Sequence, residues 1–551
     1  MTEPATPSER LLVRALSAGQ EAIDLQQQAS GSNPIFNVPA ALRLTGSLDV
    51  QALNDSFTAI VARHDVLRTT FDQDSPTTRQ VVMPAGRFDL PLHDLSQQLA
   101  HEAEATARHL VDLQAARPFE LRTEPGLRAI LIRLDDEQHV LCWVMHHIVC
   151  DGWSKSIFAQ ELSSYYAEYH KGGMTITAPQ ATYGDFVAFQ QRISPKDQAR
   201  HVDHWIQRLR LADRLTGILT DHPRRPSPVI RAEVYDIEIS TLMSEAISNL
   251  AHAHKATPFI VLYACLVAML HRVSGENTVI VNTPYSDRPT IEFESVIGFF
   301  VDILPICTQV DNDMTFEHLL RQVRHSLLTA YEHHRAPMKS VLEQVWHDTS
   351  LSHEALHQLS FSFLNLPYRE IEFAGICVEK YPVRRVDIRY EIELTLWDDD
   401  TTGGIGGRII YRPDLFEADT IRRLLDGYLA VIETTVHDPS VPISNLPAPE
   451  RSLQPGSDGW SWDLIDTDHA RMVIDPRTPT ESFVKEIFSD LLHFDTISID
   501  DNFLEIGGNS FLISLMATRI RDMLSADISV RKILHAPTIE AISAAIDREK
   551  S

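Results

Sequence analysis

Two histidines, an aspartate and a glycine lie close together in the first third of the chain, as His146, His147, Asp151 and Gly152. A neutral imidazole, with a pKa of about 6.5, can take a proton or accept a hydrogen bond from an attacking amine or alcohol. The Asp151 carboxylate is better placed to brace the loop against a cation, and Gly152 permits a tight turn or the close approach of a ligand. The chain has 25 histidines, so the pair alone also fits a strand cap.

A second candidate is Ser510, which follows Gly507 and Gly508 near the end of the chain. A serine where a loop meets a helix is most often an N-cap. An exposed serine beside two glycines also offers its hydroxyl to a modifying enzyme without obstruction. The sequence at this point leaves both interpretations open.

The elements around the histidines are predicted by hydrophobic periodicity. Apolar runs at 129–134 and 140–145 flank a polar turn and predict a hairpin. The second run does not alternate, which predicts a strand buried on both faces that ends at the histidine pair. Helical spacing at 50–61 and at 157–169 predicts one amphipathic helix before this hairpin and one after it.

The chain divides at a segment rich in proline and glycine, which predicts a linker over residues 447–478. Single cores stop growing at about 250–300 residues, so the long block before the linker predicts two α/β lobes, at 1–183 and 184–446. Residues 479–551 predict a small all-α bundle of three or four helices, taken as a four-helix carrier bundle. One helix is expected at 483–491, another from about 510, and a last one capped by Thr538.

Charge and cysteine content narrow the function classes. The net charge of −27 disfavours a nucleic-acid or anionic-membrane partner, which needs clustered Lys and Arg. The five cysteines contain no CxxC pair, so they predict neither a disulfide framework nor a zinc site. The first residues lack an apolar signal core, and no apolar run approaches the roughly 20 residues that span a bilayer. We therefore expect a cytoplasmic monomer without a metal.

Taken together, the motifs of the long block resemble the condensation-domain family of nonribosomal peptide synthetases. The family signature HHxxxDG matches residues 146–152. Three further motifs, RHxxLRTxF, YxDF and IGxFV, match in the right order, and the opening SxAQ motif matches with Gly19 in place of the usual Ala. The matching segments are 17–20, 63–71, 183–186 and 297–301.

This resemblance implies two chloramphenicol-acetyltransferase-like lobes that face one another in a V-shaped pseudo-dimer, with a tunnel between them. It implies that His147 is the active histidine at mid-tunnel, with Asp151 and Gly152 beside it in the catalytic motif, and that His146 is a supporting residue. It also places Asp151 in a salt bridge with Arg288 of the other lobe, a structural role. Whether His147 is a general base or positions the amine is left open.

Two segments depart from the family pattern. Asp302 stands where Asn is usual. The segment that usually reads HQDxPFE reads HHRAPMK at residues 333–339, which inverts its charge. These changes affect acceptor recognition or lobe contacts, or they are neutral surface drift.

The stretch 501–510 resembles the carrier-protein motif DxFxxxGGxS. The resemblance implies that Ser510 carries 4′-phosphopantetheine, added by a separate phosphopantetheinyl transferase. No adenylate-forming motif and no GxSxG elbow lies between the lobes and the carrier, so an adenylating enzyme acting in trans is expected to load the arm. The chain is then either a natural in-trans module or a piece of a megasynthase.

We therefore expect a condensation–carrier didomain that moves an acyl or peptidyl group from an upstream donor carrier to an acceptor amine. Ester formation with a hydroxyl acceptor remains an alternative. Epimerisation is disfavoured by Trp153 and Ser154 after the glycine. A plant-type acyltransferase that uses coenzyme A would need DFGWG, which is absent. A degenerate recruitment platform is the alternative outside enzymes, and the intact residues of the first motif argue against it.

Overall fold

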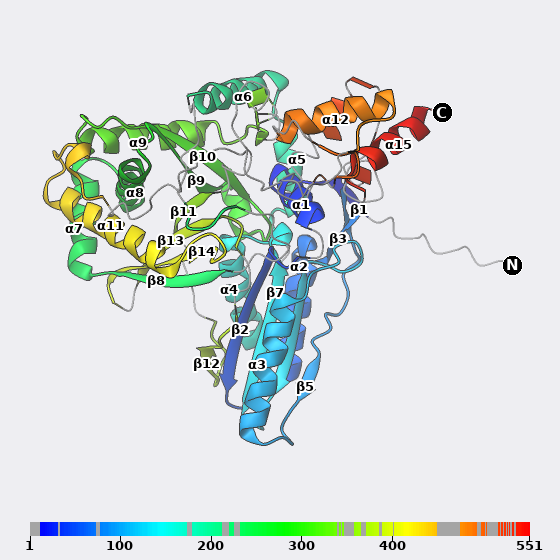
Figure 1. Cartoon of the computed structure of the whole chain (residues 1–551). Coiled ribbons are helices and arrows are strands. Elements are labelled where there is room, and N and C mark those ends of the chain that lie inside the picture. Colours follow the sequence, from blue (N-terminus) through cyan, green and yellow to red (C-terminus); the bar gives the residue numbers. More distant parts are fainter. Residues whose placement is uncertain are drawn as a thin grey trace.

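The structure is a computed structural model of the whole chain (Figure 1). It describes residues 12–448 apart from 31–32, 73–77, 174–178, 212–219, 225–231, 339–340, 343, 346–357, 365–370, 385–387 and 400–401. After residue 473 it describes 474–492, 497–501, 503, 516–517, 519–521, 523–524, 526, 528, 532–533 and 536–550.

The first lobe, the N-lobe, is built on a five-stranded sheet in the order β12-β2-β7-β6-β5. Its central strands are antiparallel, and β5 runs parallel to β6. The hairpin predicted around residues 129–145 is confirmed as β6 and β7. The strands are β2 (Asn37–Thr45), β5 (Leu92–Asp94), β6 (Leu127–Arg133), β7 (Gln138–His146) and β12 (Cys377–Lys380).

Strand β7 is buried on both faces, as its unbroken apolar run predicted. Leu141 and Met145 belong to the cluster that includes α2 (Val50–Arg63) and α4 (Gly152–His170), which lie side by side. Val140 and Cys142 belong to a separate cluster under α3 (Ala100–Ala116). The strand that carries the histidines is thereby fixed between two layers of helices.

A smaller sheet in the order β1-β4-β3 and two more helices complete the N-lobe. Helix α5 spans the predicted lobe boundary between residues 183 and 184, and its buried side chains pack into the N-lobe core. The boundary itself stays a prediction. The elements are β1 (Leu12–Ala15), β3 (Thr69–Asp72), β4 (Arg79–Val82), α1 (Ala18–Ser30) and α5 (Tyr183–Gln190).

The second lobe, the C-lobe, is built on a six-stranded mixed sheet in the order β10-β9-β11-β13-β14-β8. Strand β11 pairs in parallel with its two neighbours, and the other pairs are antiparallel. The strands are β8 (Glu233–Ile239), β9 (Thr278–Ser286), β10 (Val301–Gln309), β11 (Leu359–Leu364), β13 (Ile392–Asp399) and β14 (Gly404–Tyr411).

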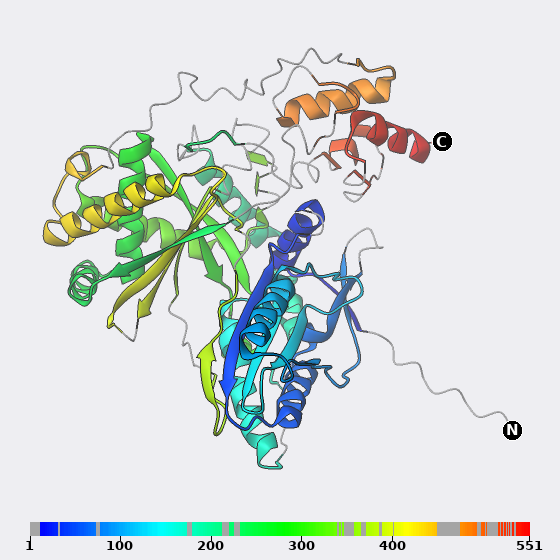
Figure 2. The same ribbon diagram turned by 60° about the horizontal axis from the view of Figure 1, so that its bottom comes forward.

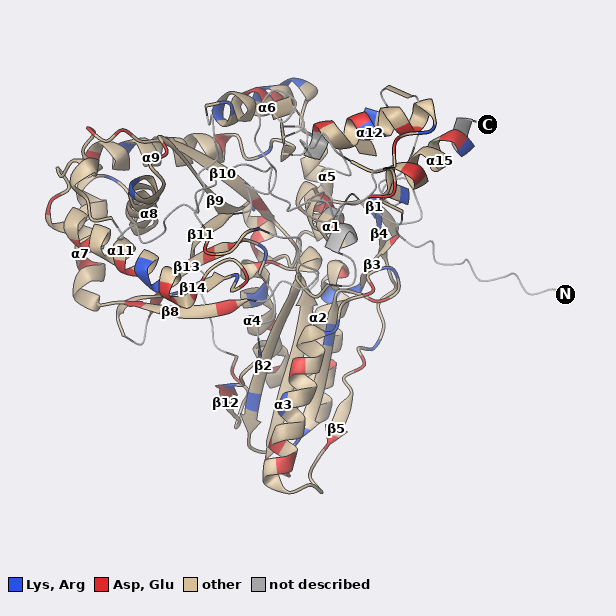
Figure 3. Ribbon diagram, viewed as in Figure 1, with Lys and Arg blue, Asp and Glu red and all other residues tan. Residues whose placement is uncertain are grey.

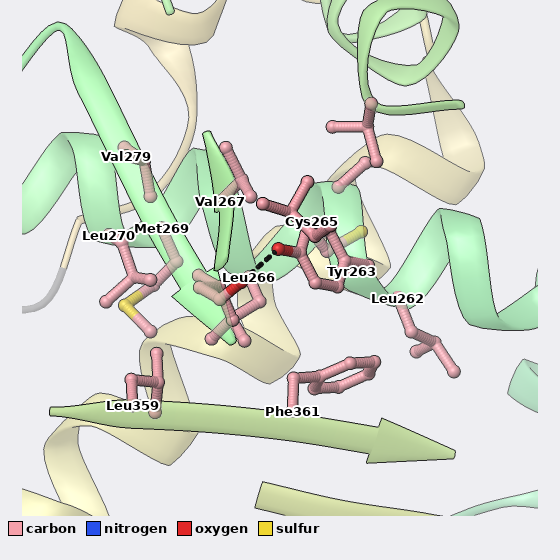
Figure 4. Packing of buried hydrophobic residues seen from close by; sticks show 14 of the residues in the cluster. Leu262, Tyr263, Cys265, Leu266, Val267, Met269, Leu270, Val279, Leu359 and Phe361 are labelled. Atoms are coloured by element: carbon pink, nitrogen blue, oxygen red, sulfur yellow. Dashed lines mark hydrogen bonds between the residues drawn. The ribbon is translucent and has the colours of Figure 1, made fainter. Parts of the chain in front are cut away.

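The C-lobe core centres on α8, the helix with the most apolar sequence. Thr257 caps its start and Gly275, at a φ of +76°, ends it in the left-handed conformation that favours glycine. The Tyr263 hydroxyl donates to the Val281 carbonyl over 2.8 Å, which ties α8 to β9 (Figure 4). The C-lobe helices are α6 (Pro195–Leu209), α7 (Thr241–Ala253), α8 (Pro258–Ser274), α9 (Phe316–Glu332) and α11 (Ala418–His437).

The two lobes are interlocked by exchanged segments. Strand β12 leaves the C-lobe and pairs with β2 of the N-lobe in antiparallel register. The segment between β9 and β10 contributes Phe293, Ile297 and Phe300 to the N-lobe core. Figure 2 shows β12 beside β2, far from the rest of the C-lobe. This exchange brings parts of both lobes to the end of β7.

The carrier region contains the predicted first and last helices, as α12 (Pro479–Leu492) and α15 (Ile539–Lys550). They share an apolar cluster with Phe488 and Ile542 at its centre. The Thr538 hydroxyl accepts from the Ala541 N–H over 3.2 Å, so the predicted cap is confirmed. The predicted helix start at Ser510 lies outside the described residues.

Among the described residues, no single helix is both long and apolar enough to cross a bilayer. The pair α7 and α8 passes by length and composition when taken together, but the two are bent by 98°. Helix α8 is buried in the C-lobe core.

Candidate active site

The candidate active site lies where β7 turns into α4. Strand β7 ends at His146, a single 3₁₀ turn covers His147–Val149, and α4 begins at Gly152. The Asp151 side chain caps α4, because its Oδ1 accepts from the Ser154 N–H over 2.7 Å. The pattern HHxxxDG thus encodes a strand end, a tight turn and a capped helix start.

His146 is a packed residue of the core. Its Nδ1 accepts from the Ile148 N–H over 3.1 Å, which leaves the proton on Nε2, 3.2 Å from Oε1 of Gln27. The ring lies 5.7 Å from those of Phe36 and Phe119. Burial lowers the pKa of His146 to about 3. The side chain is neutral and holds the turn in place.

His147 is only partly buried and its ring has a defined tautomer. Its Nδ1 lies 2.8 Å from the Cys150 carbonyl oxygen, which can only accept, so Nδ1 carries the proton. No described residue hydrogen-bonds Nε2, so its lone pair is available to a ligand. Burial, and next the positive charges of Arg389 and Lys155, hold the pKa of His147 well below its ordinary value.

Asp151 forms the ion pair with Arg288 that the resemblance implied. The Arg288 Nη2 lies 3.1 and 3.2 Å from the two Asp151 oxygens. The side chains are 1% and 7% exposed. Oδ2 also accepts from the Phe300 N–H over 3.2 Å. Both carboxylate oxygens are thus engaged inside the protein, in contacts that join the two lobes.

Arg288 is itself held by the segment between β9 and β10. Its Nη1 donates to the carbonyls of Phe293 and Val296 over 2.6 and 2.8 Å. The guanidinium carbon lies 3.9 Å from the centre of the Phe300 ring. Burial lowers the pKa of Arg288, and the nearby Asp151 opposes this effect. The arginine therefore fixes this C-lobe segment against the turn that bears His147.

Two further hydroxyl groups bond the segment between β9 and β10 close to the turn, and the sequence had predicted neither contact. The Ser154 hydroxyl donates to the Gly298 carbonyl over 2.8 Å and accepts from the Gly298 N–H over 3.0 Å. The Tyr183 hydroxyl donates to the Phe299 carbonyl over 2.6 Å and lies 2.7 Å from the Ser17 hydroxyl. Tyr183 belongs to the YxDF motif and Ser154 follows HHxxxDG, and both side chains bond the same segment between β9 and β10.

The residues that depart from the family pattern form their own contacts in the C-lobe. His334 Nε2 and Arg335 Nε lie 3.2 and 3.7 Å from the two oxygens of Asp287. Burial, and next the charge of Asp287, raises the pKa of Asp302 to about 7. The inverted charges of this segment are thus matched by a neighbouring carboxylate. Lys339 lies outside the described residues.

The described residues contain no group of three or more His, Cys, Asp or Glu side chains arranged to hold a metal ion. Phe503 and Met516 are the described residues nearest to Ser510 in the sequence on either side, and both are buried in the carrier core. Ser510 itself lies outside the described residues.

Comparison with known proteins agrees with this geometry. Residues 13–452 match the family model of the condensation domain, and residues 482–546 match that of the phosphopantetheine attachment site. The second match indicates that a serine of this region carries 4′-phosphopantetheine, and it implies partnership with a phosphopantetheinyl transferase and with other carrier or adenylation domains.

One similar relative is a linear gramicidin synthase from Brevibacillus parabrevis, which is 32% identical over 78% of this chain. The match spans only 6% of that much longer protein. Solved structures share the fold. The X-domain from teicoplanin biosynthesis has a TM-score of 0.67 and 23% identity, over 81% of this chain and 99% of that one. The four-domain nonribosomal peptide synthetase AB3403 has a TM-score of 0.70 and 20% identity, over 88% of this chain and 37% of that one.

Proposed function

The chain belongs to the condensation-domain family of nonribosomal peptide synthetases and also contains a carrier domain, and from this premise we propose that it forms amide bonds. The donor is an acyl or peptidyl thioester on an upstream carrier, and the acceptor is an amine held on the chain's own carrier. The amine nitrogen bonds to the thioester carbon, the carbon–sulfur bond breaks, and the amine proton ends on the thiol that leaves. The observation that carries this proposal is the available Nε2 of His147, held beside the lobe junction.

His147 acts on the attacking amine as a positioning group. Its protonated Nδ1 is committed to the Cys150 carbonyl, so Nε2 can accept a hydrogen bond from the amine N–H. Because its pKa lies well below the ordinary value, the imidazole is a weak base and does not hold an added proton near neutral pH. Orienting the lone pair of the amine toward the carbonyl carbon therefore contributes more than proton removal does.

Gly152 allows the helix to begin close behind the turn, and the Asp151–Arg288 pair holds both lobes against it. These residues hold His147 in position, and His147 alone contacts the reacting atoms. His146 supports the same turn from the core side. The bound arm supplies a thiol that holds an acyl group as a thioester and the reach to bring it to this site.

Ser510 is the proposed attachment residue of that arm, because the motif at 501–510 ends on it. A phosphopantetheinyl transferase adds the arm, and an adenylating enzyme acting in trans loads it. We further propose a cytoplasmic monomer that binds neither nucleic acid nor membrane. The net charge of −27 supports this, and Lys and Arg are scattered over both lobes in Figure 3.

The test is intact-mass spectrometry of the full chain after treatment with a phosphopantetheinyl transferase. Ser510→Ala should remain at the mass of the unmodified chain, whereas the wild type gains one arm. The loaded wild type is then mixed with a loaded donor carrier, using paired amino and hydroxy acceptors of the same side chain. Product on the amino acceptor alone supports amide formation. Product on the hydroxy acceptor alone would show ester formation in place of amide formation. No product on either acceptor would refute the proposal.

A further inference from the structure

The Phe299 ring is the aromatic neighbour of His147. The two ring centres lie 5.7 Å apart and the planes meet at 81°, an edge-to-face arrangement. Phe299 is 7% exposed, so its ring fills the space on this side of the imidazole. The room left for a substrate at this point depends on the position of that ring.

The backbone that carries Phe299 cannot easily retreat, because it is bonded at three consecutive residues. The Gly298 N–H is held by Ser154, the Phe299 carbonyl by Tyr183 and the Phe300 N–H by Asp151, over 3.0, 2.6 and 3.2 Å. Asp151 and Tyr183 belong to the HHxxxDG and YxDF motifs, and Ser154 follows the first of these motifs by two residues. The ring can therefore move only about its own side-chain bonds.

The space behind the ring is limited by Gly19 in the first turn of α1. A Cβ placed on Gly19 would lie 2.9 Å from both Cδ1 and Cε1 of Phe299 and 3.0 Å from the Val301 carbonyl oxygen. Contacts this short require a shift of the ring, since the backbone oxygen belongs to a paired strand. The departure from the usual alanine at residue 19 thus makes room for a large aromatic ring beside His147.

The chain's own carrier lies on the same side of the molecule as α1 in both Figure 1 and Figure 2. Leu342 of the C-lobe packs against the apolar cluster of the carrier. Helix α1 therefore lies on the side from which we infer that the carrier's own cargo approaches, and the Phe299 ring packs against Gly19 in its first turn. Under the proposed function, that cargo is the acceptor.

We propose that Phe299, backed by Gly19, is a specificity-determining residue that restricts the acceptor to small side chains. The inference rests on the proposed function for the identity of the acceptor. The ring packs edge-to-face against the His147 imidazole and thereby limits the volume that a large acceptor side chain could use beside it. Pockets of this kind discriminate by roughly 10–200-fold for a single methylene group, and steric exclusion by a fixed ring should exceed the lower value.

The test uses the full chain with non-hydrolysable glycyl, alanyl, leucyl and phenylalanyl pantetheine amides, whose affinities are measured by calorimetry. The same four amino acids are then loaded on the carrier, and the single-turnover rate of amide formation is measured for each with one fixed donor. The wild type should prefer glycyl and alanyl. Phe299→Ala should raise the leucyl-to-glycyl ratio at least about 10-fold in both measurements. Gly19→Ala adds a Cβ against the ring and should lower the same ratio by crowding the space beside His147. The double variant should behave like Phe299→Ala.

Phe361→Leu is the matched control, because Phe361 is also buried but lies in the C-lobe core. It should lower stability without changing either ratio. If Phe299→Ala does not fold, as judged by circular dichroism, Phe299→Leu replaces it, with a smaller shift expected. Unchanged ratios in a folded variant, or a shift in a donor series in place of the acceptor series, would overturn the inference. Affinity ratios that shift while the wild type forms no amide would refute the proposed function and support the size restriction.

Discussion

Removing the Asp151 carboxylate should destabilise the protein far more than removing an ordinary ion pair. Asp151→Ala leaves the Arg288 guanidinium almost fully buried without a counter-charge, and such a loss costs about 3–5 kcal/mol. It also removes the cap of α4, worth about 1 kcal/mol, and leaves the Phe300 N–H without its acceptor. The losses are coupled, so their sum is an upper bound.

The free energy of unfolding is measured in urea, with the carrier transition followed separately because two-state behaviour is not expected of a chain with several domains. Asp151→Asn keeps an oxygen for the cap and should cost less than Asp151→Ala. In a double-mutant cycle with Arg288→Met, the coupling energy should be at least about 2 kcal/mol, within the range for residues that share one network. The cycle separates the free energy of the Asp151–Arg288 ion pair from that of the helix cap.

The matched control is Arg321→Ala on α9. Arg321 pairs with Glu317 over 2.6 Å, but the side chains are 58% and 39% exposed, and pairs of this kind contribute about 0.3–0.5 kcal/mol. An unfolding free energy of Asp151→Ala within about 1 kcal/mol of the wild type would refute the view that this ion pair holds the lobes together.

Three smaller perturbations test other contacts of the site and its surroundings. Tyr183→Phe should cost about 1–3 kcal/mol in urea unfolding because it leaves the Phe299 carbonyl without its donor; no change would contradict the anchoring role. Gly298→Ala should reduce the yield of folded protein, since its Cβ would overlap the Tyr183 ring, and normal yield and stability would argue against so close a packing. His334 is buried, which disfavours its charge, but its hydrogen bond with Asp287 leads the effects that raise its pKa. Its stabilising contribution should therefore be complete below about pH 6.5 and lost as pH rises through the folded pKa. The difference in unfolding free energy between the wild type and His334→Asn should accordingly narrow toward pH 8. A difference that widens would mean that folding lowers the pKa of His334.

Local patterns predicted the elements that carry the chemistry. The unbroken apolar run at 140–145 predicted a doubly buried strand, and periodicity predicted the helices that became α2 and α4. The cap at Thr538 followed from a serine/threonine preference that needs no tertiary information. These features depend on residues a few positions apart, so the sequence displays them directly.

Contacts between distant segments could not be predicted in the same way. Tyr183 meets Phe299 across 116 positions, and Ser154 meets Gly298 across 144. Strand β12 pairs with β2 after more than 300 intervening residues, and nothing in its four-residue sequence marks it as part of the other lobe. The resemblance supplied the Asp151–Arg288 pair, whereas the role of Gly19 emerged only from the space that its missing Cβ leaves.

The most direct test of the account is the single-turnover rate of His147→Ala with a loaded donor and an amine acceptor. The central claim is that Nε2 of His147 orients the attacking amine. The variant should keep its fold and the phosphopantetheine on Ser510 but form amide at least about 100-fold more slowly than the wild type. A fully loaded, folded variant that condenses at the wild-type rate would show that His147 is not the working residue.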